Sequence, residues 1–295
     1  MKATAIKAPQ PSFALSSRNR YNGTMNALKL LVSPAALCIW AICVCVGFSI
    51  AGSNASRTVT FGQETKFGYA KSSFPIHMKR WDEALFNLLT ARAKGEMAEF
   101  LKGAEQDAAA RPQEEEAPAR TPYAQSSGYI EQFRTLRFVS YLEVASLVQG
   151  DGQPMIAFRT VNFDKEGNRE VGLGDILEGA ADRSKALEAL AAYARADLKD
   201  RTGEEGEEES EALLELTKPD LSVYERFTLC PSTKLGNAAG LTIHFPPSAS
   251  GPYAGTDFHV TVPYTVFAKF LKPAMKTLFA GEPRQAPVSL EDAGI

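Results

Sequence analysis

The sequence predicts an α+β fold, mainly an antiparallel sheet flanked by two helices and preceded by one transmembrane or signal helix. Alternating apolar and polar residues, typical of half-buried strands, recur within residues 57–76, 130–163 and 227–262. Two stretches near residues 80–103 and 183–199 instead repeat apolar residues at spacings of three and four, which is typical of helices. Because the links between strands are too short for crossovers, antiparallel pairing is favoured.

Residues 30–51 form a run of 22 positions without a charged side chain. At 1.5 Å per residue, a helix of this length spans a hydrocarbon core of about 30 Å. No acidic residue precedes the run, and the basic residues before it are Lys2, Lys7, Arg18, Arg20 and Lys29. The positive-inside rule therefore predicts a single pass, with residues 1–29 in the cytoplasm and the rest in the periplasm or outside the cell.

Two interpretations of this run remain open. A permanent membrane anchor is favoured, because 22 apolar residues exceed the usual signal-peptide core of about 7–15 residues. A cleaved signal peptide is the alternative, since residues 49–51 and 53–55 both offer the small side chains that a signal peptidase accepts. Met25 begins a compact Met-Asn-Ala-Leu-Lys start, so translation from Met1 or from Met25 is also open.

The first half of the part after the run contains strands and one long helix. Residues 57–61 and 67–76 are predicted to form a hairpin or two edge strands. A helix is predicted over about 80–103, and its apolar face contains Trp81, Ala84, Leu85, Leu88, Leu89, Met97, Phe100 and Leu101. Residues 104–122 carry no apolar pattern and are predicted to be an exposed loop.

The second half begins with an antiparallel meander over residues 130–163, with turns at 150–152 and 165–168. A helix follows at about 183–199, and its apolar face contains Leu187, Leu190, Ala191, Ala194 and Leu198. Six Glu within residues 204–211 predict a solvated loop or a frayed helix start. The remaining predicted elements are strands at 227–230, 241–245 and 258–262 and a short helix at 266–271.

These elements suggest a division of the chain into five parts. The predicted parts are a basic cytoplasmic segment (1–29), the anchor or signal segment (30–51), an N-terminal module (52–164), a C-terminal domain (165–272) and a tail (273–295). The 244 residues after the run are enough for a substantial core.

The charge of residues 52–295 limits the kinds of partner. This part contains 27 Lys and Arg against 35 Asp and Glu, a net charge of −8. Nucleic acid is excluded as a partner, because its phosphates would be repelled. A cationic protein, or a cell-envelope polymer with cationic groups, is favoured. Only Cys230 lies outside the apolar run, so no disulfide can form within the exported part.

Signals for catalysis or metal binding are weak. His77, His244 and His259 are isolated in sequence, and the strand pattern predicts that His244 faces solvent. No Cys or carboxylate stands at ligand spacing near them, so neither a metal nor another cofactor is expected. Cys230 follows an apolar strand and is predicted to be a buried, inert thiol. The sequence contains neither a Gly-x-Ser-x-Gly elbow nor a phosphate-binding loop, and the chain is predicted not to be an enzyme.

The C-terminal block carries a recognisable order of motifs. Gly240-Leu-Thr leads into an apolar strand, a Pro252-Tyr253-Ala254-Gly255 turn, a strand closing with Pro263-Tyr264, and a helix. With the upstream Phe163-Asp164 and residues 171–177, this order resembles the C-terminal domain of the RsiV-like family of bacterial extracytoplasmic domains of unknown function. Residues 74–149 are similar to the companion N-terminal module, which is also seen in some polysaccharide deacetylases. Residues 150–153 read Gly-Asp-Gly-Gln where the family has Gly-Gly-Ala-His.

The resemblance implies a non-catalytic extracytoplasmic domain that binds or senses something in the envelope. Known relatives are anti-sigma factors whose outer domain binds lysozyme, so a cationic protein such as lysozyme is the expected partner, and peptidoglycan is the alternative. An anti-sigma factor or lysozyme inhibitor, and an envelope polysaccharide-modifying enzyme, are the alternative functions. The candidate partner-binding residues are Asp151, Gln153, Tyr253, Glu204, Glu205, Glu207, Glu208, Glu209 and Glu211.

Overall fold

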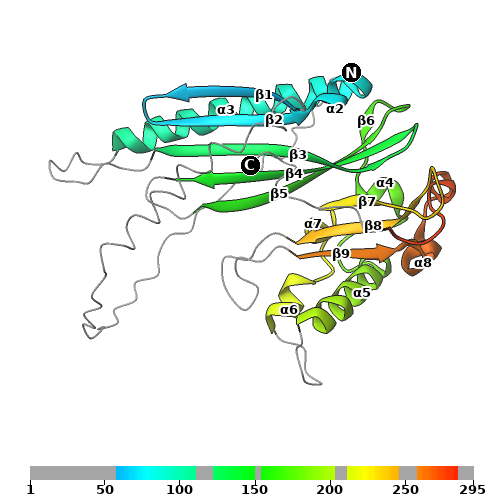
Figure 1. Ribbon diagram of the computed structural model, residues 1–295. Coiled ribbons are helices and arrows are strands. Elements are labelled where there is room, and N and C mark those ends of the chain that lie inside the picture. The colour runs from blue at the N-terminus through cyan, green and yellow to red at the C-terminus, as the bar shows by residue number, and fades with distance from the viewer. Residues whose placement is uncertain (1–57, 111–121, 150–153, 203–210, 246–257, 285–295) are drawn as a thin grey trace, which may run out of the picture. The chain divides into compact units, whose positions relative to one another are not determined.

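The computed structural model describes residues 58–110, 122–149, 154–202, 211–245 and 258–284. These residues all belong to one compact unit that begins at Asn54. It contains a large six-stranded sheet and a smaller three-stranded sheet, with helices packed on both (Figure 1). The predicted α+β class is confirmed, whereas the predicted membrane segment lies outside the described residues.

The large sheet has its strands in sequence order. Its strands are β1 (Thr58–Thr65), β2 (Gly68–Pro75), β3 (Tyr123–Arg134), β4 (Phe138–Val148), β5 (Met155–Asp164) and β6 (Arg169–Glu170). The predicted hairpin of β1 and β2 and the antiparallel meander of β3 to β5 are confirmed, although the turn between β3 and β4 at residues 135–137 was not predicted. The pairing of β2 with β3 is parallel, which the sequence interpretation missed. Helices α2 (Ile76–Trp81) and α3 (Glu83–Ala110) supply the crossover that a parallel pair requires.

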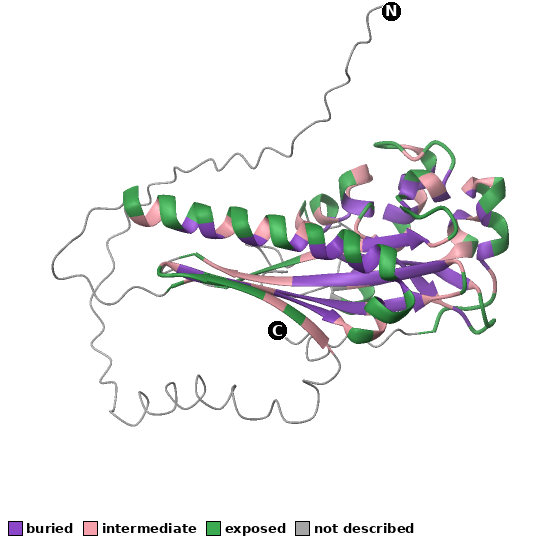
Figure 2. Ribbon diagram, turned by 90° about the horizontal axis from the view of Figure 1, so that it is seen from above, coloured by how far each residue is buried: buried purple, intermediate pink, exposed green. Residues whose placement is uncertain are grey.

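Helix α3 differs from its prediction at both ends and in its exposed face. The predicted single helix is interrupted at Asp82, and the part predicted as a loop from residue 104 is helical as far as Ala110. Trp81 is 59% exposed, Leu88 is 42% exposed and Ala84 is also exposed, so all three were wrongly assigned to the apolar face. The buried stripe along α3 faces the sheet (Figure 2) and contains Leu85, Phe86, Leu89, Ala93, Met97, Leu101 and Ala104.

The small sheet consists of β7 (Phe227–Pro231), β8 (Ala238–Phe245) and β9 (Phe258–Pro263), all antiparallel. The predicted second helix is confirmed as α5 (Lys185–Thr202), and its five predicted apolar residues are all buried against this sheet. The remaining short helices are α4 (Leu173–Ile176), α6 (Glu211–Leu216), α7 (Leu221–Tyr224), α8 (Tyr264–Phe267), η2 (Ala268–Phe270) and η3 (Pro273–Leu278).

Side chains of the large sheet cap the free edge of β7. The amide nitrogen of Asn162 donates to the carbonyl of Phe227 at 2.8 Å, and the hydroxyl of Ser140 accepts from the backbone N–H of Leu229 at 3.2 Å. Ser140 in turn donates to the Asn162 carbonyl oxygen at 2.6 Å. These buried bonds satisfy backbone groups that an edge strand would otherwise leave unpaired.

The strand pairings define two ends of the described unit. Thr58 pairs with Pro75, and the β3–β4 turn, the end of β5 and the end of β7 lie on the same side, which we call the Thr58 end. Helix α8 lies there too, because it directly follows the last residue of β9 (Figure 1). On the opposite side β8 ends at Phe245 and β9 begins at Phe258, and we call this the Phe245 end.

Candidate functional site

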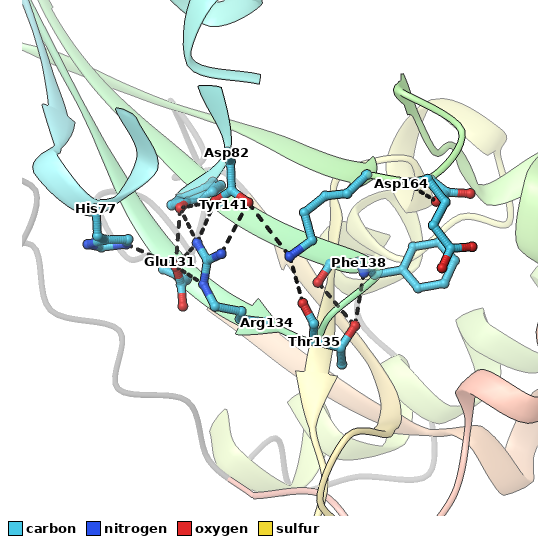
Figure 3. A network of polar contacts seen from close by, with 10 residues as sticks. His77, Asp82, Glu131, Arg134, Thr135, Phe138, Tyr141 and Asp164 are labelled. Carbon is cyan, nitrogen blue, oxygen red and sulfur yellow. Dashed lines mark hydrogen bonds and ion pairs between the residues drawn. The ribbon is translucent and has the colours of Figure 1, made fainter. Parts of the chain in front are cut away.

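A network of charged side chains joins the break between α2 and α3 to the β3–β4 hairpin (Figure 3). Arg134 donates through Nη1 and Nη2 to the two carboxylate oxygens of Asp82, at 3.1 and 2.6 Å. Its Nε and Nη2 also donate to Glu131 Oε2, at 2.9 and 2.6 Å. The Tyr141 hydroxyl donates to Glu131 at 3.1 Å, and His77 Nε2 lies 2.9 Å from the same Glu131 oxygen. We call these five residues the Arg134 network.

The network holds Glu131, Arg134 and Tyr141 in fixed charge states. Burial alone would raise the pKa of Glu131, but the hydrogen bonds with His77 and Arg134 hold it at about 2. Burial alone would lower the pKa of Arg134, but its bonds to Glu131 and Asp82 raise it. Burial and the charge of Glu131 raise the pKa of the Tyr141 hydroxyl, so it stays protonated. None of these three groups exchanges a proton near neutral pH, which fits a structural clamp better than acid–base chemistry.

A second polar cluster, with Tyr129 and Glu143 buried and Arg159 exposed, lies between α3 and the sheet. Tyr129, Glu143 and Arg159 are direct neighbours on β3, β4 and β5. Arg159 donates to Glu96 of α3 at 2.6 Å, whereas its Nε lies 3.6 Å from Glu143 Oε2. Within the described residues this Glu143 oxygen has no hydrogen-bond partner. Burial raises the pKa of Glu143, as expected for a carboxylate that is poorly compensated.

The small sheet corrects one prediction about histidine. His244 is only 2% exposed, and its Nε2 lies 2.9 Å from the hydroxyl of Thr228, so the prediction that it faces solvent is wrong. Burial, and secondarily the nearby His259, lower its pKa to about 3. The strand pattern gave a wrong prediction for His244 because both faces of β8 are buried in this sheet. Cys230 is buried as predicted, and burial raises the pKa of its thiol to about 11.

Most of the predicted partner-binding residues lie outside the described residues. This holds for Asp151, Gln153, Tyr253, Glu204, Glu205, Glu207, Glu208 and Glu209. Glu211 is described: it is exposed at the first position of α6, beside a shallow hollow that Ala212, Leu214 and Glu215 also line.

The described residues next to these candidates lie at the Phe245 end. Val148 and Met155 flank Asp151 and Gln153, and Val148 pairs with Ala124 near the start of β3. Phe245 and Phe258 flank Tyr253. Arg201, at the end of α5 before the Glu-rich tract, donates to the carbonyl of His259 at 2.8 Å. Sequence spacing gave no indication that these three connections belong to one end of the fold.

Within the described residues, no group of His, Cys, Asp and Glu is arranged to hold a metal ion. None of the helices in the described ranges is both long enough and apolar enough to cross a membrane. The apolar run 30–51, on which the membrane prediction depends, falls outside those ranges.

Comparison with known proteins identifies a domain class. Residues 175–265 match the family described as "Protein of unknown function (DUF3298)", so the chain carries a DUF3298 domain of unknown function there. This region extends from α4 to α8 and contains α5 and the whole small sheet. The finer RsiV-like assignment stays a prediction.

Two solved structures of this family are similar to the chain. A DUF3298 family member from Bacteroides fragilis NCTC 9343 has 13% sequence identity and a TM-score of 0.45, covering 74% of this chain and 93% of its own. A DUF3298 family protein from Pseudomonas aeruginosa PAO1 has 14% identity and a TM-score of 0.41, covering 77% of this chain and 96% of its own. No curated protein matches the chain.

Proposed function

We propose that this chain is a membrane-tethered, non-catalytic binding or sensing protein of the bacterial envelope, with its binding surface at the Phe245 end. One observation carries the proposal. The described residues that flank all three groups of candidate binding residues lie at the Phe245 end, and the chain arrives from the apolar run at the opposite end. A tethered receptor needs this arrangement, because its ligand must reach a surface that the membrane does not block.

A cationic protein such as lysozyme is the partner class that the charges favour. Five Glu lie within residues 203–210, and Glu211 continues the tract as an exposed residue of α6. Acidic tracts attract a cationic partner over distances that physiological salt screens to about 8 Å. The fixed charge states of Glu131, Arg134 and Tyr141 support a non-catalytic role, since catalysis of proton transfer requires a group that changes its protonation.

The test is binding of the full-length chain, in detergent micelles, to lysozyme and to proteins of an envelope extract. One variant replaces the six tract residues Glu204, Glu205, Glu207, Glu208, Glu209 and Glu211 with Gln. The charge-matched control replaces six exposed residues elsewhere, namely Glu99, Glu105, Glu166, Glu178, Glu188 and Glu282. We expect the tract variant, but not the control, to slow association and to weaken its dependence on salt.

Three results would count against the proposal in different ways. Equal effects of both variants would refute the acidic tract as the contact, although binding itself would stand. Binding to purified peptidoglycan instead of to a protein would replace the partner class. Hydrolysis of peptidoglycan, or release of acetate from it, by the purified chain would overturn the non-catalytic role.

A further inference from the structure

We infer that the Thr58 end is a second interaction surface, which docks on the anionic phospholipids of the membrane that the chain is anchored in. The inference takes the anchor from the proposed function, but the surface itself rests on described residues. Its features are exposed apolar side chains, an excess of cations and the point at which the chain reaches the folded unit.

Four of the nine large apolar side chains that are exposed in the described residues lie at this end, and two of them are almost fully exposed. Leu136 in the β3–β4 turn is 98% exposed, and Leu235 in the β7–β8 connection is 99% exposed. On α2, Ile76 is 50% exposed and Trp81 is 59% exposed. The interfacial region of a bilayer accepts Leu and favours Trp in particular.

The Arg134 network holds Trp81 in place. The Arg134 guanidinium lies 5.4 Å from the centre of the Trp81 ring, and the His77 ring lies 5.5 Å from it. Asp82, the next residue, anchors the end of α2 through its buried ion pair with Arg134. An otherwise mobile surface Trp is thereby presented in one orientation, which lowers the entropy lost when it enters an interface.

Cations dominate the same end. Segments 76–82, 134–138, 165–178, 232–237 and 264–284 together contain eleven Lys and Arg and six Asp and Glu. Of the acidic groups near these cations, Asp82, Glu131, Asp164 and Asp175 are paired with arginine and Glu166 lies near Arg137, whereas Glu178 and Glu282 are exposed. Within the described ranges, six exposed cations here take part in no ion pair: Lys79, Arg80, Lys234, Lys269, Lys276 and Arg284. Each such cation near an anionic leaflet strengthens docking by roughly fivefold.

The chain enters the described unit at this end. Only residues 52–57 lie between the apolar run and Thr58 in sequence. Thr58 pairs with Pro75, the residue directly before Ile76 and the rest of α2. The proposed docking surface is therefore the end of the unit that follows the proposed anchor in sequence.

The sequence offers a direct test, because its only tryptophans are Trp40 in the apolar run and Trp81 at the Thr58 end. The full-length Trp40→Phe variant is reconstituted in vesicles of phosphatidylglycerol and phosphatidylcholine whose acyl chains carry bromine near the headgroups. We expect bromine to quench most of the Trp81 fluorescence. Quenching should fall in high salt, in vesicles without phosphatidylglycerol, and after Lys79→Glu with Arg80→Glu.

Controls separate this surface from the anchor. A Trp40→Phe/Trp81→Phe/Tyr69→Trp variant places the probe at the β1–β2 turn, on the Phe245 side, and should remain unquenched. Leu136→Ser with Leu235→Ser should reduce Trp81 quenching without affecting folding, because both leucines are almost fully exposed. The Trp81→Phe variant leaves Trp40, at the middle of the apolar run, to report on the anchor, and it is measured in vesicles whose acyl chains carry bromine near the bilayer centre.

The possible results distinguish the docking surface from the membrane anchor. Quenched Trp40 with unquenched Trp81 would overturn the docking surface and leave the tether intact. Quenched Trp81 with unquenched Trp40 would support the docking surface and overturn the anchor. Equal quenching of Trp81 and of a Trp at position 69 would also overturn the inference, because it would mean that the unit lies on the membrane without a preferred face.

Discussion

At the scale of single residues, Asp82 is constrained by both its backbone and its side chain. Its backbone leaves the helical region, with φ −136° and ψ 53°, and its N–H donates to Met78 while its carbonyl accepts from Phe86. Its side chain is fully buried and is neutralised by Arg134, with Lys165 3.7 Å away. One residue thus separates α2 from α3 and binds their junction to the β3–β4 hairpin.

We therefore expect Asp82→Asn to lower the free energy of unfolding by about 3 kcal/mol, because the substitution removes the fully buried charged partner of the partly buried Arg134. Urea denaturation of the full-length chain in micelles would measure this change in the free energy of unfolding. The control is Arg169→Gln, which breaks an exposed ion pair with Asp175 and should cost at most about 1 kcal/mol. Equal losses in the two variants would show that the Arg134 network does not clamp the fold.

His244 predicts a pH dependence of stability. Its pKa is lowered to about 3 in the folded protein, from an ordinary value of 6.5. As the pH falls below 6.5 the unfolded chain binds a proton that the folded chain does not, so stability is complete above 6.5 and is lost toward pH 3. The slope approaches about 1.4 kcal/mol per pH unit.

His244→Gln should remove this slope between pH 6.5 and 5, measured by urea denaturation at each pH. Glu131→Gln serves as the control, because the pKa of Glu131 is lowered from 4.5 to about 2, so its contribution to stability is lost only below pH 4.5. A wild-type slope that survives in His244→Gln would assign the effect to another group.

At the scale of elements, α3 connects the parallel strands β2 and β3 and covers one face of the large sheet. It contains Gly95 and Gly103 in its exposed face, where an added Cβ would meet nothing within 4 Å. Gly240 in β8 is different, because a Cβ there would lie 2.1 Å from the carbonyl oxygen of Val262. The same residue type is thus a weakness in the helix and a requirement in the sheet.

Gly95→Ala should raise the free energy of unfolding by about 0.5–1 kcal/mol, since Ala has less backbone entropy to lose and favours the helix. Gly240→Ala should lower it by more than this gain, because the backbone of β9 would have to move. Thermal or urea unfolding monitored by circular dichroism would compare the two. Destabilisation by Gly95→Ala would mean that α3 is not helical at that position.

At the scale of the whole molecule, the strand directions give the described unit two chemically different ends. The almost fully exposed Leu136 and Leu235, and six exposed cations outside ion pairs, lie at the Thr58 end, and the connection that contains the Glu-rich tract leaves from the Phe245 end. The proposed functions use these ends separately, one for the membrane and the other for the partner.

The proposed topology predicts where the C-terminus lies. A reporter enzyme that is active only in the cytoplasm, fused after Ile295, should give no signal, and one that is active only after export should give a strong signal. Strong cytoplasmic activity would refute the localisation. A mature protein that begins near Gly52 would instead select the cleaved signal peptide over the anchor.

The sequence by itself determined the α+β class, the antiparallel meander, the position of α5 with its buried face, and the inert burial of Cys230. These features depend on local periodicity, which a single chain displays directly. Its missing catalytic motifs and its charge suggested a binding role, but they named no surface.

The other features of the fold were decided only by the tertiary structure, because they depend on contacts between residues that are far apart in sequence. The parallel β2–β3 pair, the break at Asp82 and the burial of His244 all arise from such contacts. Asp82 and Arg134 are 52 positions apart, and no spacing rule connects them. Likewise, only the strand order placed Trp81, Leu136 and Leu235 at one end, because side chains far apart in sequence meet only when the sheets have formed.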